Sequence, residues 1–142
     1  MFQCPDDDKQ KLQNIFFIPF QALPTITQYI KSGDYAQLIG LFSQRAKDSL
    51  IKDVETNWTE LQKNNINIEF DDMNSTVIDK CFYHKVGRDV FVDITVKYCA
   101  IKKDLHPAMS IELSATFSRK YGPGCLPDWT ITDFKIDHVA PI

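Results

Sequence analysis

Histidines and cysteines are the first residues of this chain to consider as metal ligands. Cys81 and His84 have a spacing found in zinc sites. The alternating pattern around them predicts a strand, and residues three apart on a strand point to opposite faces. His106 precedes a proline in a predicted turn, and His138 lies near the end of the sequence. The sequence therefore predicts no metal site.

The cysteines also suggest no redox motif. Their spacings match no C-x-x-C pattern. An even number permits disulfides, but we expect reduced, buried thiols in an intracellular domain. Two glycosylation sequons, Asn57-Trp58-Thr59 and Asn74-Ser75-Thr76, are expected to be chance matches, because no secretory signal precedes them. The four cysteines are Cys4, Cys81, Cys99 and Cys125.

General acid or base chemistry would need a carboxylate or histidine in a buried site that tunes its pKa. Asp93 and Glu112 are the carboxylates of the two clearest predicted strands, and both alternate out of phase with the apolar residues. No phosphate-binding loop, dinucleotide fingerprint or nucleophile elbow is present in the sequence. We expect a protein with no catalytic residues and no cofactor, and hence no enzyme.

Composition points to one folded domain. The chain has 142 residues, of which 44% are hydrophobic and 25% charged, as in ordinary globular proteins. Its net charge is −3 and no basic block stands out, which disfavours DNA binding through phosphate contacts. No apolar run approaches the roughly 20 residues that a membrane-spanning helix needs.

Helical spacing dominates the first half of the sequence. Leu23, Ile26 and Ile30 predict a helix that ends at Gly33. Asp34 can cap a short second helix, and Ser43 a long third one that ends at Lys63-Asn64-Asn65. The apolar stripes of these two helices are Tyr35, Leu38, Ile39 and Phe42, then Ala46, Leu50, Val54, Trp58 and Leu61.

The second half alternates with the period of a strand. Strands are predicted over 66–70, 76–86, 90–100 and 109–117, with turns at Gly87-Arg88 and His106-Pro107. In the segment "LPDWTITDFKID" (126–137) the apolar residues change faces near Thr132-Asp133, which predicts a β-bulge.

Helices followed by an antiparallel meander predict an α+β domain. The expected form is a cystatin/NTF2-like cone, in which the N-terminal helices pack on a curved antiparallel sheet. The domain should span residues 15–142, after a polar, acidic and flexible tail over 1–14.

One apolar stretch, "NIFFIPF" (14–20), has two interpretations. Phe16, Phe17 and Phe20 either pack against the sheet and close the cone, or form an interaction patch for a partner or a membrane surface. We expect Phe16 and Phe17 to differ in role: one seals the core, and the other stays available for a protein or membrane surface.

Two longer segments carry a family resemblance. "FYHKVGRDVFVDITVKY" (82–98) and "FSRKYGPGCLPDWTITDFKI" (117–136) resemble the mitochondrial m-AAA protease-interacting proteins, which are Tim44-like, NTF2-like domains. The most specific part of the likeness is Pro127-Asp128-Trp129. The "GD" turn at Gly33-Asp34 and its flanking helices also look like the family's opening.

The resemblance implies a non-enzymatic, chaperone-like adaptor in the mitochondrial matrix, peripheral to the inner membrane. Its partners would be the m-AAA protease and newly imported inner-membrane proteins whose sorting or assembly it assists. No transit peptide is recognised in the sequence. The alternatives are a structural subunit of the mitochondrial large ribosomal subunit, where ribosomal RNA would be a partner, or a small NTF2-like enzyme or ligand binder.

Overall fold

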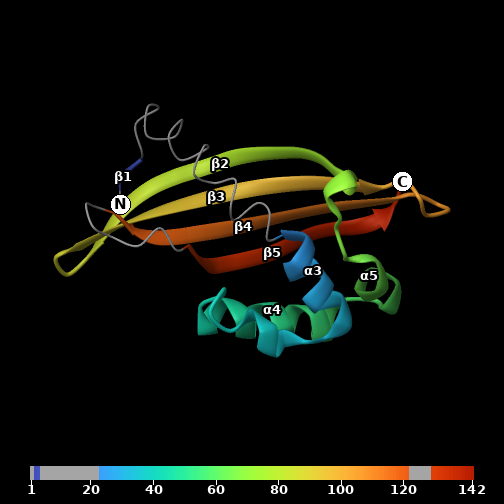
Figure 1. Cartoon of the computed structure of the whole chain (residues 1–142), viewed down its shortest axis with the longest axis horizontal. Coiled ribbons are helices and arrows are strands. Elements are labelled where there is room, and N and C mark those ends of the chain that lie inside the picture. The colour runs from blue at the N-terminus through green and yellow to red at the C-terminus, as the bar shows by residue number, and fades with distance from the viewer. Residues whose placement is uncertain (1, 4–22, 122–128) are drawn as a thin grey trace.

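An antiparallel sheet with helices on one face makes up the computed structural model, which describes residues 2–3, 23–121 and 129–142 (Figure 1). The strands follow one another in the order β1-β2-β3-β4-β5, and each pairs with the next in antiparallel register. The predicted α+β class is confirmed. The strands are β1 (Phe2–Gln3), β2 (Met73–Val86), β3 (Asp89–Lys102), β4 (Met109–Tyr121) and β5 (Thr130–Pro141).

The helices come between β1 and β2 in the chain and lie along one side of the curved sheet (Figure 1). Two further single turns, η1 and η2, are 3-10 helices. The bounds are α3 (Leu23–Ser32), η1 (Tyr35–Leu38), α4 (Gln44–Asn57), α5 (Glu60–Asn65) and η2 (Phe70–Asp72).

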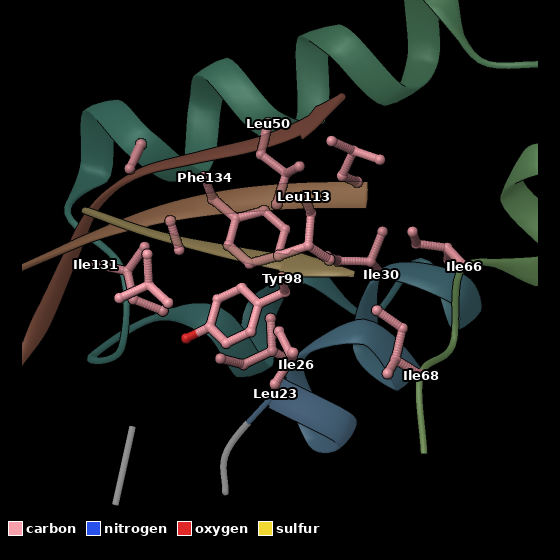
Figure 2. Packing of buried hydrophobic residues seen from close by; sticks show 14 of the residues in the cluster. Leu23, Ile26, Ile30, Leu50, Ile66, Ile68, Tyr98, Leu113, Ile131 and Phe134 are labelled. Atoms are coloured by element: carbon pink, nitrogen blue, oxygen red, sulfur yellow. The ribbon is translucent and has the colours of Figure 1, made fainter. Parts of the chain in front are cut away.

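A single apolar core joins the helices to the sheet. Leu50 of α4 and Ile26 of α3 face Leu113 and Phe134 of the sheet (Figure 2). Burial of every second residue on β3 and β4 follows from the alternation of a pleated strand. The inward residues of these two strands include Val92, Ile94, Val96, Ile111, Leu113 and Phe117, all of them buried.

The bulge predicted in the last strand is present. Phe117 pairs with Ile131 and Thr116 with Asp133, so Thr132 is the extra residue on β5. The insertion turns Ile131 and Phe134, which are an odd number of residues apart, toward the same core. A second shift in the β4–β5 register places Asp137 as another extra residue. The apolar residues of β5 therefore change phase in the sequence without leaving the core.

The long third helix predicted from Ser43 is instead two helices, because the chain breaks the helix at Trp58 and Thr59. Ser43 does cap α4, and its Oγ accepts a hydrogen bond from Ala46 N at 3.2 Å. The helix ends at Asn57, and Thr59 starts α5 through a capping box with Gln62. Leu61, assigned to the apolar stripe, is consequently 55% exposed.

Two other local predictions are also corrected. The second helix is only the single turn η1, because the chain turns at Gly40 with φ of +92°, and Ile39 is 67% exposed. Residues 66–70 do not form a strand. Ile66 and Ile68 are buried nonetheless, as the alternation suggested, but the segment is held by side-chain contacts rather than by a neighbouring strand.

Thr27 makes the main contact of that kind, and replacing it tests its role. Its buried hydroxyl accepts a hydrogen bond from Ile68 N at 2.9 Å and donates to Pro24 O at 3.1 Å. Thr27→Val keeps the shape but leaves the Ile68 N–H buried without a partner, so we expect a loss of about 1–3 kcal/mol in unfolding free energy. Urea titration measures it. Thr25→Val, on the exposed side of α3, is the control, and equal stability of the two variants would contradict this role.

The predicted N-terminal tail is described only in part. Phe2 and Gln3 pair with Tyr83 and Phe82 of β2. The other residues of 1–14, and the candidate patch Phe16, Phe17 and Phe20, lie outside the described residues. Among the helices described, none has the length and apolar character to cross a membrane.

Candidate functional site

A buried charged residue, which was not predicted from the sequence, lies on the inner face of the sheet at the end of β3. Lys102 continues the inward alternation of β3 after Ala100 and is only 6% exposed. Its Nζ donates to Asn67 O at 2.7 Å and lies 3.7 Å from the Asp72 carboxylate. These contacts tie the segment before β2 to the end of β3. We call Lys102, Asn67 and Asp72 the Lys102 clamp, and its role is structural.

Tyr98 is another buried polar side chain of the inner face. Its ring lies in the core near Ile131 and Ile26 (Figure 2). Burial raises the pKa of the Tyr98 phenol far above its ordinary value. The phenol is therefore neutral at physiological pH and has no tendency to act as a base there.

A histidine and a carboxylate meet on the outer face of the sheet. His84 Nδ1 lies 2.8 Å from Asp93 Oδ2, and the imidazole stacks on Phe91 at 5.4 Å between ring centroids. Cys81 is buried on the opposite face, as predicted. Within the described ranges, no three metal-ligating side chains come together.

A hollow of about 370 Å³ lies on the same outer face. Its walls include Lys97, Cys99, Glu112 and Asp137. The two carboxylates are exposed to solvent. An enzyme of the kind considered above would place such a group inside the fold, where burial shifts its pKa. This hollow therefore gives no support to general acid or base chemistry.

The cysteines differ from expectation. Cys81 is disulfide-bonded, whereas Cys99 is a free thiol. The prediction of reduced thiols is therefore wrong for Cys81. Disulfides form and persist chiefly in oxidising compartments, so this bond bears on where the protein works.

The β2–β3 hairpin extends past the helices at one end of the sheet (Figure 1). Aromatic and cationic side chains gather at that end. Tyr83, Arg119, Tyr121 and Trp129 form this hairpin-end cluster. Tyr83 and Arg119 both pair with Val92, whose side chain is buried on the inner face, so they lie on that face too. The cluster thus extends the inner face beyond the last row of core residues.

The cluster combines ring contacts with unpaired hydrogen-bond donors. The Arg119 guanidinium lies over the Trp129 ring, 5.2 Å from its centroid. Tyr83 and Tyr121 meet edge to face at 5.0 Å between centroids. Arg119 Nε and Trp129 Nε1 are buried, and neither has a hydrogen-bond partner in the structure as described. Buried donors of this kind normally find an acceptor, so the cluster is suited to a ligand that brings one.

Of the motif Pro127-Asp128-Trp129, only Trp129 is described, and it belongs to the cluster. Tyr83, Arg119 and Tyr121 were not predicted from the sequence as site residues. Pairing of Val86 with Asp89 around the Gly87-Arg88 turn fixes the hairpin register. The turn could have been used to predict this register from the sequence, and the register places Tyr83 opposite Val92 on the inner face.

Fold and site together define an α+β domain whose inner face holds an apolar core at one end and an aromatic, cationic cluster at the other. No protein-family model, curated protein or solved structure matches this chain.

Proposed function

We propose that this chain is a non-enzymatic adaptor that binds a partner protein through the hairpin-end cluster. The observation that carries the proposal is the pair of buried donors, Arg119 Nε and Trp129 Nε1, that lack an acceptor. Leaving such a donor unpaired costs about 1–3 kcal/mol, and a carboxylate or carbonyl from a partner would recover that energy. Trp, Tyr and Arg are also the residue types that dominate binding energy at protein interfaces.

The family resemblance supplies one version of this adaptor. In it the domain is a cystatin/NTF2-like cone in the mitochondrial matrix, peripheral to the inner membrane, and its partners are the m-AAA protease and inner-membrane client proteins. Helices on a curved sheet and the position of Trp129 in the cluster support this version. Phe16, Phe17 and Phe20 would add a second, apolar contact, which Phe→Ser variants at each position test.

The Cys81 disulfide favours another version, in which the adaptor works in an oxidising compartment. We prefer this version, since the disulfide is a property of the fold itself. Microscopy of the tagged full-length protein in its own cells separates the two. A matrix signal supports the mitochondrial version, and a secretory or extracellular signal supports the oxidising one.

Variants of the cluster test the adaptor function in either compartment. Arg119→Gln and Trp129→Phe each remove one unpaired donor, and Trp129→Phe also keeps an aromatic ring. We expect each to weaken partner binding about tenfold or more, as hot-spot substitutions do, while the unfolding midpoint stays near that of the wild type. The measurement is quantitative affinity purification from the native cells, followed by mass spectrometry and thermal unfolding of each variant.

Lys135→Ala is the matched control, because Lys135 is exposed on the outer face of β5. Proteins lost with both cluster variants and kept by this control are the predicted partners. If the cluster variants and Lys135→Ala retain the same proteins in the same amounts, the cluster is not the binding site.

A further inference from the structure

The sequon Asn74-Ser75-Thr76 lies at an exposed irregularity of the sheet. Met73 pairs with Ala100 and Ser75 with Cys99, so Asn74 is an extra residue in a bulge of β2. Asn74, Ser75 and Thr76 are all exposed to solvent. A bulge leaves its extra residue out of the ladder, so a group attached to the Asn74 side chain displaces no packed neighbour.

The position of this bulge on the sheet is also favourable. β2 is one of the two outer long strands of the sheet, and among the described residues its outer edge is paired only at Phe82 and Tyr83, with β1. Asn74 lies about 26 Å farther along the strand, at roughly 3.3 Å per residue. Natural proteins protect exposed strand edges against pairing with other chains. A large polar group on Asn74 would give that protection.

The Cys81 disulfide supplies an independent indication of the compartment. N-linked glycans and structural disulfides are both marks of secreted and cell-surface proteins. Cys81 and Asn74 lie on the same strand. The sequon is therefore found on an exposed bulge in a fold that also contains a disulfide.

We propose that Asn74 carries an N-linked glycan. The Asn74 Nδ2 attacks the anomeric carbon of a lipid-linked glycosyl diphosphate. A C–N bond forms, the C–O bond to the diphosphate breaks, Nδ2 loses one proton, and the lipid diphosphate leaves. No oxidant or reductant is required. The modification is a further property of the protein, independent of what the hairpin-end cluster binds.

The second sequon, Asn57-Trp58-Thr59, provides the contrast within the same chain. Asn57 Nδ2, the atom that would be modified, donates to Asp53 Oδ1 at 2.7 Å. Thr59 caps α5, and Trp58 Nε1 donates to Asp53 at 3.3 Å. The side chain of every residue of this sequon thus makes a hydrogen bond at the junction between α4 and α5. We infer that Asn74, and not Asn57, is the modified site.

Mass spectrometry of the protein purified from its own cells tests the proposal. Peptide-N-glycosidase converts each glycosylated asparagine to aspartate, so the treated peptides report occupancy at both positions. We expect conversion at Asn74 and none at Asn57. An unmodified Asn74 overturns the proposal, as does a glycan found at Asn57 alone.

Variants expressed in the same cells provide the matched set. Asn74→Gln and Thr76→Ala should abolish the gel shift that the glycosidase produces, whereas Thr76→Ser and Asn57→Gln should keep it. Thr76→Ser preserves the hydroxyl of the sequon and controls for damage to β2. A shift that survives Asn74→Gln contradicts the assignment. Partner binding, measured on the same samples, reports separately on the adaptor function.

Discussion

Replacement of Leu113 by alanine is expected to lower the free energy of unfolding by about 2–5 kcal/mol, as for other buried leucines. Leu113 lies in the middle of β4, between Tyr98 of β3 and Ile136 of β5, and is 1% exposed. Leu50 of α4 is close to it in the core (Figure 2). The truncation removes contacts with both layers, and the cavity it leaves adds to the lost burial. Urea or thermal unfolding measures the change.

Ser114→Ala is the control for this substitution. Ser114 is the next residue on β4 and points to the outer face, where it pairs with Lys97 and Lys135. We expect a change within about 0.5 kcal/mol, as for most surface positions. If Leu113→Ala proved no more damaging than Ser114→Ala, the face assignment of the whole sheet would be wrong.

Loss of the Lys102 ammonium is expected to have an effect of similar size, about 3–5 kcal/mol, since breaking a buried ion pair leaves its partner uncompensated. Lys102→Met keeps most of the apolar stem. It leaves Asn67 O without the donor now 2.7 Å away, and the Asp72 carboxylate without its nearby cation. Chemical unfolding of the single variant gives the value.

Two further variants define the origin of that loss. Lys103→Met removes a charge from the exposed neighbouring position and should be nearly neutral. In the double variant Lys102→Met with Asp72→Asn no charge is left unpaired, so it should be more stable than Lys102→Met alone. Equal stability of Lys102→Met and Lys103→Met would show that the clamp contributes nothing.

Periodicity predicted the larger part of the fold. The inward residues of β3 and β4 follow from strict alternation, and the Thr132 bulge follows from the change of phase between Ile131 and Phe134. These features depend only on which face of a strand meets a core. A one-dimensional pattern is sufficient for that.

Local capping and tertiary contacts decided the rest. The apolar stripe continues through Trp58, but the capping box at Thr59 ends α4 and starts a new helix. Ile66 and Ile68 alternate like a strand, yet the buried hydroxyl of Thr27 takes the Ile68 N–H. The capping box and the Thr27 hydrogen bond both override the apolar periodicity. The Thr27 contact joins residues 41 positions apart, so a local sequence pattern does not predict it.

The candidate site was harder to predict than the core. Trp129 stood out in the sequence as part of a family-like motif, but Arg119 looked like one charge among several near the end of a strand. Two features of the structure make Arg119 important. Its guanidinium lies over the Trp129 ring, and its buried Nε has no hydrogen-bond acceptor among the described residues. Only the registers of three strand pairs bring Tyr83, Arg119 and Trp129 to one place.

The most direct test of the adaptor proposal is site-specific photo-crosslinking at the hairpin-end cluster in living cells. A photoreactive residue in place of Tyr121, which is 46% exposed at the edge of the cluster, should give a discrete adduct with a partner protein. The adduct should fade when Arg119→Gln or Trp129→Phe is added, and the same probe at Lys135 on the outer face should not form it. No adduct at position 121, or one that both substitutions leave unchanged, would contradict the proposed function.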